Sequence, residues 1–186
     1  MKYKLLVLDV DGTLLNNQKE ISPRTLAALL KVQQMGVHIV LASGRPTNGV
    51  MPIAEKLELN HYGGYILSYN GGQIINVQTG ELLFEKRIDP EWIPYFVQKR
   101  ENDFAIFTYH KDFILTDKPD NKYVIQEANL NKMQVVGAIT SPKPRISHPA
   151  NVCWQVTTKR RSSAWKIIGR NASTVCWMHS GRNLIS

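Results

Sequence analysis

The feature of this sequence that most constrains its fold is a short apolar run that ends in two acidic residues. Leu5-Leu6-Val7-Leu8 is followed directly by Asp9-Val10-Asp11-Gly12-Thr13. A continuous apolar run of this length predicts a strand buried on both faces of a parallel sheet. Ligands of such sheets gather beyond the carboxyl ends of the strands. We therefore expect an α/β fold whose first strand carries Asp9 and Asp11 to a functional edge.

The residues after this run have the side chains that phosphoryl transfer requires. Asp9 is the candidate nucleophile, forming an aspartyl-phosphate once a divalent cation offsets its repulsion from the phosphoryl oxygens. Asp11 is the candidate acid and base for the leaving oxygen and the attacking water. Gly12 permits a positive φ that turns backbone N–H groups toward a phosphate, and Thr13 can brace the turn with its hydroxyl. The alternative is an ordinary acidic loop with a capping aspartate.

Together with Leu14, these residues resemble the first motif of the haloacid dehalogenase superfamily of phosphohydrolases. Leu41 to Pro46, with Ser43-Gly44-Arg45 at its centre, follows a second apolar run and resembles the second motif in its Cof-type (subclass IIB) form. Ser68 to Gly72 resembles the Asn-Gly segment at the end of the third strand, beside the entrance to the site. The resemblance implies Mg²⁺ held by Asp9 and by the backbone carbonyl of Asp11. It also implies a small phosphorylated metabolite, such as a sugar phosphate, bound by Gly12, Thr13, Ser43 and Gly44, with Arg45 and Asn70 nearby.

Three of these residues have other interpretations. Ser-Gly-Arg-Pro is also common loop chemistry before a helix, so the weight on Ser43 comes from the upstream motif. Arg45 can pair with the substrate phosphate or with an acid at a domain interface. Asn70-Gly71 fits a simple turn as well as it fits a place beside the substrate.

The segments between the motifs predict alternating strands and helices. Ser22-Pro23 opens a helix that Gly36 ends, Pro46 opens a second helix, and a third strand covers residues 65–69. Because loops after consecutive parallel strands share one sheet edge, Asp9, Asp11, Ser43 and Asn70 are expected to converge. Residues 73–77 and 81–87 form an expected hairpin. A helix from Pro90 and an antiparallel pair at 104–107 and 113–115 resemble the start of an α/β cap. Residues 1–86 are thus assigned to an incomplete Rossmann-like core and 87–140 to a partial cap.

The last part of the sequence has a different composition. All 15 acidic residues lie before position 128, whereas residues 141–186 hold 8 Lys and Arg, both cysteines and three of the four tryptophans. A basic run with tryptophans is compatible with nucleic acid or an anionic membrane, but no zinc spacing, RNA-binding motif or amphipathic helix accompanies it. We favour translation in a shifted frame or truncation after about residue 140, which makes 141–186 an aberrant or disordered tail.

This composition affects the expected activity. The superfamily's third motif, a lysine, and its fourth, a Gly-Asp-x-x-x-Asp-like carboxylate pair, are not found, so we expect impaired catalysis. The alternatives to a phosphatase are a phosphomutase-type phosphotransferase and an inactive remnant or phosphate-binding module. The N-terminus has no signal peptide and no apolar run is long enough to span a membrane, so a cytoplasmic protein is expected. The sequence does not indicate the oligomeric state.

Overall fold

The computed structural model describes residues 3–87, 105–137 and 155–156, and the chain divides into two units, Met1–Lys86 and Arg87–Ser186. Strands and helices alternate at the start of the first unit. Its elements are β1 (Leu5–Asp9), α1 (Pro23–Gln34), β2 (His38–Ala42), α2 (Thr47–Lys56), α3 (Leu59–Tyr62), β3 (Gly64–Ser68), the short 3₁₀ helix η1 (Tyr69–Gly71), β4 (Gln73–Asn76) and β5 (Leu82–Glu85). The expected strand–helix–strand–helix–strand order is confirmed.

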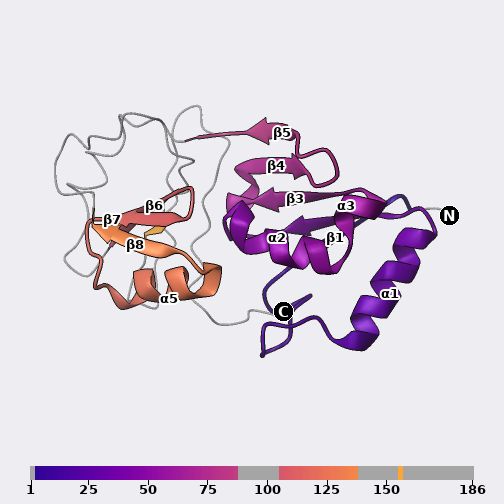
Figure 1. Ribbon diagram of the computed structural model, residues 1–186, viewed down its shortest axis with the longest axis horizontal. Coiled ribbons are helices and arrows are strands. Elements are labelled where there is room, and N and C mark those ends of the chain that lie inside the picture. The colour runs from indigo at the N-terminus through magenta and orange to yellow at the C-terminus, as the bar shows by residue number, and fades with distance from the viewer. Residues whose placement is uncertain (1–2, 88–104, 138–154, 157–186) are drawn as a thin grey trace, which may run out of the picture. The chain divides into compact units, whose positions relative to one another are not determined.

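The first unit contains a five-stranded sheet in the order β1-β2-β3-β4-β5 (Figure 1). β1, β2 and β3 pair in parallel, whereas β3, β4 and β5 pair antiparallel, which confirms the predicted hairpin. Asp9 is in register with Ala42, and Ala42 with Leu67. The carboxyl ends of the three parallel strands therefore lie side by side at one sheet edge, as an α/β fold requires.

The prediction that the first strand is buried on both faces is wrong. β1 lies at the edge of the sheet formed by the described strands, and its side chains alternate between partly buried and exposed positions. Leu6 and Leu8 pack against the core, but Leu5 is 55% and Val7 59% exposed. The apolar run identified a strand correctly, but its neighbours decide its burial, because β1 pairs with β2 alone in the described sheet.

The helices bury one face of the sheet. α1 begins where expected, because the Ser22 side chain accepts a hydrogen bond from the Thr25 N–H (3.2 Å) and proline occupies the first turn. α2 follows Pro46, which takes the N-cap position rather than the first helical one. All three helices contribute to one apolar cluster with β2 and β3: Leu29, Val50, Ile53, Ala54, Leu59, Ile39, Leu41 and Ile66.

Backbone hydrogen bonds close the turn after β1. The Leu14 N–H donates to the Asp9 carbonyl (3.2 Å) and the Leu15 N–H to the Val10 carbonyl (2.9 Å). Gly12 has a φ of +85°, the positive value that its sequence position predicts. The expectation that Thr13 braces the turn is wrong, because Thr13 is exposed and its hydroxyl makes no hydrogen bond within the described part of the chain. The turn is held by main-chain bonds instead.

The second unit contains a sheet in the order β8-β7-β6-β9 and the helix α5 (Figure 1). Its elements are β6 (Ile106–His110), β7 (Phe113–Thr116), α5 (Lys122–Asn131), β8 (Gln134–Gly137) and β9 (Gln155–Val156). The predicted antiparallel pair is confirmed as β6 and β7, and the aromatic side chains of Phe107 and Tyr109 are buried. α5 and β8 were not predicted from the sequence.

Some predictions lie outside the described residues. They are the helix from Pro90 and nearly all of the basic segment 141–186. Within the part of the chain that the structure describes, no helix combines the length and the apolar character needed to cross a membrane.

Candidate active site

The candidate site lies at the carboxyl ends of β1, β2 and β3. Asp9 is the last residue of β1 and is exposed, and its register partner Ala42 immediately precedes Ser43. Asp11 belongs to the turn that follows β1, and Arg45 lies in the loop between β2 and α2. Parallel pairing therefore brings together residues that are more than 30 positions apart in the chain.

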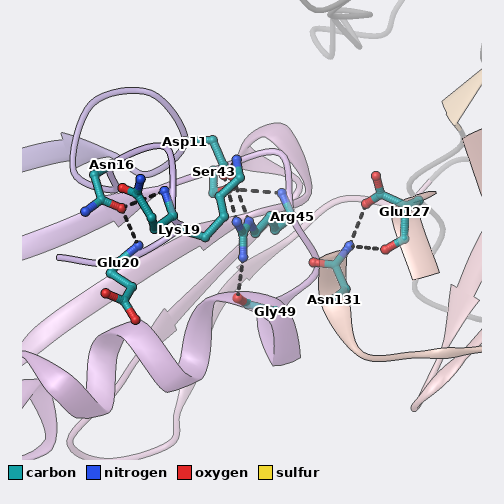
Figure 2. Close-up of polar contacts among 10 residues, drawn as sticks. Asp11, Asn16, Lys19, Glu20, Ser43, Arg45, Gly49, Glu127 and Asn131 are labelled. Carbon is teal, nitrogen blue, oxygen red and sulfur yellow. Dashed lines mark hydrogen bonds and ion pairs between the residues drawn. The ribbon is translucent and has the colours of Figure 1, made fainter. Parts of the chain in front are cut away.

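The Asp11 carboxylate accepts hydrogen bonds from two cationic side chains at this edge (Figure 2). Arg45 donates from Nε to Oδ2 and from Nη2 to Oδ1, each at 2.7 Å, so the pair is bidentate. Lys19 donates from Nζ to Oδ1 at 2.8 Å. Arg45 also donates to the Gly49 carbonyl at 3.3 Å. From the sequence, Arg45 is expected to pair with the substrate phosphate or with an acid at a domain interface, but its partner in the structure is Asp11 of the same unit.

The contacts of Asp11 decide its protonation. Partial burial acts to raise its pKa, but the hydrogen bonds and positive charges of Arg45 and Lys19 outweigh that effect, and the net pKa is lowered. Asp11 is therefore a carboxylate at neutral pH in this arrangement. A carboxylate held in this way is a weak base, because the contacts that keep it ionised also oppose its protonation.

Ser43 lies beside Arg45 in a loop that is fixed on both sides. Its Oγ accepts a hydrogen bond from the Arg45 N–H at 3.1 Å. Its own N–H donates to the Leu67 carbonyl (2.9 Å), and its carbonyl accepts from the Asn70 N–H (3.2 Å). The loop after β2 is thus joined to the end of β3, which holds the Ser43 hydroxyl at the sheet edge.

Asn70 reaches the same loop through an unusual backbone. Tyr69, Asn70 and Gly71 have φ values of 53°, 55° and 85°, so three consecutive residues are left-handed. This conformation is disfavoured for the two residues that have a Cβ. It brings Asn70 against Gly44, where an added Cβ would lie 2.9 Å from the Asn70 Oδ1. Glycine at 44 leaves the space that the Asn70 side chain occupies.

A chain of buried hydrogen bonds joins the elements that flank the loops carrying Arg45 and Asn70. Ser68 and Thr47 join through their hydroxyls at 2.7 Å, and Thr47 donates to the Gln73 Oε1 at 2.6 Å. The chain links the start of α2, the end of β3 and the start of β4. These buried hydrogen bonds consequently fix the ends of the loops that carry Arg45 and Asn70.

Lys19 also contacts Asp11, and sequence patterns did not identify it as a site residue. It lies eight positions after Asp11 in a loop that contains Asn16 and Asn17, residues typical of turns. A lysine in a turn shortly after a candidate acid is a weak signal, because charged residues are common in exposed loops. Only the folded loop shows that its ammonium group contacts Asp11.

The donor set fits part of a magnesium site. Mg²⁺ binds through one or two carboxylates, keeps several waters and is completed by substrate phosphate oxygens. Asp9 offers an exposed carboxylate, and the Asp11 backbone carbonyl is a second oxygen of the type the ion prefers. Within residues 3–87, 105–137 and 155–156, no group of three or more His, Cys, Asp or Glu side chains is placed to hold a metal. These two residues are thus a partial ligand set.

Comparison with known proteins gives consistent matches. The family model described as haloacid dehalogenase-like hydrolase matches residues 6–184. A Streptococcus pyogenes (serotype M6) protein, provisionally named a phosphatase, is 31% identical over 137 residues, which are 73% of this chain and 51% of that protein. The 5-amino-6-(5-phospho-D-ribitylamino)uracil phosphatase of Bacillus subtilis is 31% identical over 93 residues, covering 48% of this chain and 36% of that enzyme.

A solved structure shows the same architecture. The crystal structure of a haloacid dehalogenase-like hydrolase from Bacteroides thetaiotaomicron superimposes with a TM-score of 0.67 at 46% sequence identity. The match covers 74% of this chain and 52% of the other. The chain therefore spans about half the length of the first relatives and structures that it matches.

Proposed function

Because this chain belongs to the haloacid dehalogenase-like hydrolases, we propose that it hydrolyses small phosphomonoesters with Mg²⁺ and an aspartyl-phosphate intermediate. The observation that carries the proposal is the juxtaposition of Asp9, the Asp11–Arg45 pair and Ser43 at one edge of a parallel sheet. Two carboxylates with distinct surroundings and a fixed hydroxyl match the needs of phosphoryl transfer. The bound phosphorylated metabolite is the proposed partner, and neither nucleic acid nor membrane is part of the proposal.

Asp9 is the proposed nucleophile. It is exposed at the end of β1, whereas Asp11 is engaged by two cations. An oxygen of Asp9 forms a bond to phosphorus as the bond from phosphorus to the leaving oxygen breaks. When bound, Mg²⁺ supplies the charge neutralisation that lets an anion approach the phosphoryl oxygens. Ser43 and Gly44, with the Gly12–Thr13 turn, are proposed to hold those oxygens.

Asp11 is the proposed acid and base. As a carboxylate it accepts the proton of the water that hydrolyses the aspartyl-phosphate, which releases inorganic phosphate and restores Asp9. Its lowered pKa keeps Asp11 ionised before this step, and the contacts of Arg45 and Lys19 must weaken for Asp11 to take up the proton. Protonation of the leaving oxygen requires that the bound phosphate weaken the hold of Arg45 and Lys19 on Asp11. Arg45 is then a positioning residue for Asp11 rather than a free phosphate ligand.

The substrate class rests on the Bacillus subtilis relative, whose name describes a phosphorylated ribitylamino compound. A sugar phosphate or a related polyol phosphate is the proposed substrate. We also propose that turnover is weak. The described part of the chain supplies only the partial ligand set of Asp9 and Asp11, and no third carboxylate is placed there to complete it.

The test is a Mg²⁺-dependent assay of the purified chain with p-nitrophenyl phosphate. Asp9→Asn abolishes turnover, whereas Asp120→Asn, at an exposed aspartate of the second unit, leaves it unchanged. Intact-mass analysis of the quenched wild type shows one added phosphoryl group that Asp9→Asn lacks. Wild-type turnover equal to that of Asp9→Asn identifies an inactive or phosphate-binding protein instead. Phosphate retained on a sugar product identifies a phosphotransferase.

A further inference from the structure

Lys19 places a second positive charge beside Asp11, in addition to that of Arg45. The guanidinium group of Arg45 already offsets the charge of Asp11 with two bonds of 2.7 Å, and Lys19 adds a second cation at 2.8 Å. Neighbouring Glu20 points its carboxylate away from this group (Figure 2) and takes part in neither of the two ion pairs found in the described residues. Arg45 and Lys19 therefore place two positive charges beside Asp11, and Asp9 is the other carboxylate at this edge of the sheet.

The loop that carries Lys19 is ordered by Asn16. The Asn16 Oδ1 accepts hydrogen bonds from the N–H groups of Gln18 and Glu20, both at 2.9 Å. Backbone bonds from the Asn16 N–H to the Glu20 carbonyl and from the Lys19 N–H to the Asn16 carbonyl, also 2.9 Å each, close the loop. Lys19 itself is left-handed, with a φ of 62°. This disfavoured conformation is maintained by the loop bonds, and it directs the Lys19 side chain toward Asp11.

Lys19 and Arg45 differ in what they can still bind. The Arg45 side chain is only 9% exposed and donates to Asp11 and to Gly49, whereas the Lys19 side chain is 52% exposed. An ammonium group has three N–H donors, and Asp11 Oδ1 takes one of them. Lys19 can therefore hold Asp11 and donate to a ligand at the same time.

We propose that Lys19 binds a second anionic group, a phosphate or a carboxylate, on the leaving portion of the substrate. The inference rests on the proposed function, in which Asp11 acts at the leaving oxygen. The exposed ammonium group of Lys19 contacts Asp11 and is thus placed to meet the leaving portion, whereas the buried Arg45 lies beside Ser43. Lys19 thus makes the site selective for phosphomonoesters that carry another negative charge.

The test measures binding without turnover. Isothermal titration calorimetry in Mg²⁺ buffer compares methylphosphonate with methylenediphosphonate, which adds a second anionic group at the leaving position. The wild type binds the diphosphonate more tightly, and Lys19→Met weakens its affinity about fivefold, as expected for one exposed charge-assisted contact. Methylphosphonate affinity stays unchanged in that variant. Lys19→Arg retains the preference, and Lys56→Met, at an exposed lysine in the last turn of α2, behaves as the wild type.

Two results overturn the proposal: equal affinity of the wild type for the two probes, or a diphosphonate preference that survives Lys19→Met. Thermal unfolding of each variant confirms that the chain is folded. The outcome is separable from that of the proposed function, which is tested by Asp9-dependent turnover. If turnover is absent while Lys19→Met still loses its selectivity, the phosphatase assignment fails and the anion contact at Lys19 stands.

Discussion

Replacement of Arg45 by methionine tests whether the Asp11–Arg45 pair organises the candidate site. The change removes two hydrogen bonds of 2.7 Å to Asp11 and one of 3.3 Å to the Gly49 carbonyl, from a side chain that is 9% exposed. Breaking a fully buried pair costs about 3–5 kcal/mol, and breaking an exposed pair less than about 1 kcal/mol. Asp11 is 33% exposed and keeps Lys19 as a partner. We therefore expect Arg45→Met to lower the free energy of unfolding by about 2 kcal/mol.

The assay is urea unfolding followed by far-UV circular dichroism, with a double-mutant cycle through Asp11→Asn. We expect a coupling free energy between Asp11 and Arg45 of about 1.5 kcal/mol. Arg45→Lys is the matched control, because it keeps the charge but lacks the bidentate geometry, and it recovers only part of the loss. A coupling below about 0.5 kcal/mol would refute the reasoning, since independent surface sites give values in that range.

Three further outcomes are expected. Gly64→Ala lowers the free energy of unfolding by about 2 kcal/mol, because the added Cβ would lie 2.7 Å from the Ile39 carbonyl oxygen. Gly44→Ala lowers it by less than about 1 kcal/mol, because the added Cβ meets the Asn70 side chain at 2.9 Å and that side chain can move. Urea unfolding of the two variants measures the difference. Asp11→Asn lowers the free energy of unfolding at neutral pH, and this loss disappears as the pH falls below the lowered folded-state pKa of Asp11. An equal loss at pH 7 and in strong acid would contradict this prediction. Val7→Thr changes the free energy of unfolding by less than about 0.5 kcal/mol and reduces light scattering in concentrated solution, because Val7 is 59% exposed. A larger loss of unfolding free energy would show that Val7 is buried in solution.

The pH dependence expected for Asp11→Asn follows from the direction in which folding shifts the pKa of Asp11. A carboxyl group whose pKa is lower in the folded than in the unfolded state contributes stability above its unfolded pKa. That contribution is lost as the pH falls through the folded value, because both states are then protonated. Asp11 has an ordinary pKa of 3.8 and a lowered one in the fold, so the loss occurs in acid and not near neutrality.

Local sequence patterns were enough to predict the elements around the site. Ser22-Pro23 indicated the start of α1, and the glycine at position 12 indicated the positive φ of the turn after β1. Each depends on a few neighbouring residues: a cap needs one side-chain oxygen near the first free N–H groups, and a left-handed turn needs a residue without Cβ. The α/β class followed from the order of these elements.

Contacts across the fold could not be predicted in the same way. The burial of β1 depends on which strands lie beside it, so Leu5 and Val7 are exposed although their run suggested a buried strand. The partner of Arg45 depends on the register that sets the end of β1 beside the end of β2, and the role of Lys19 depends on a loop closed by Asn16. The sequence determines the residue types and the short-range backbone geometry, whereas contacts between side chains that are distant in the chain form only once the sheet has paired.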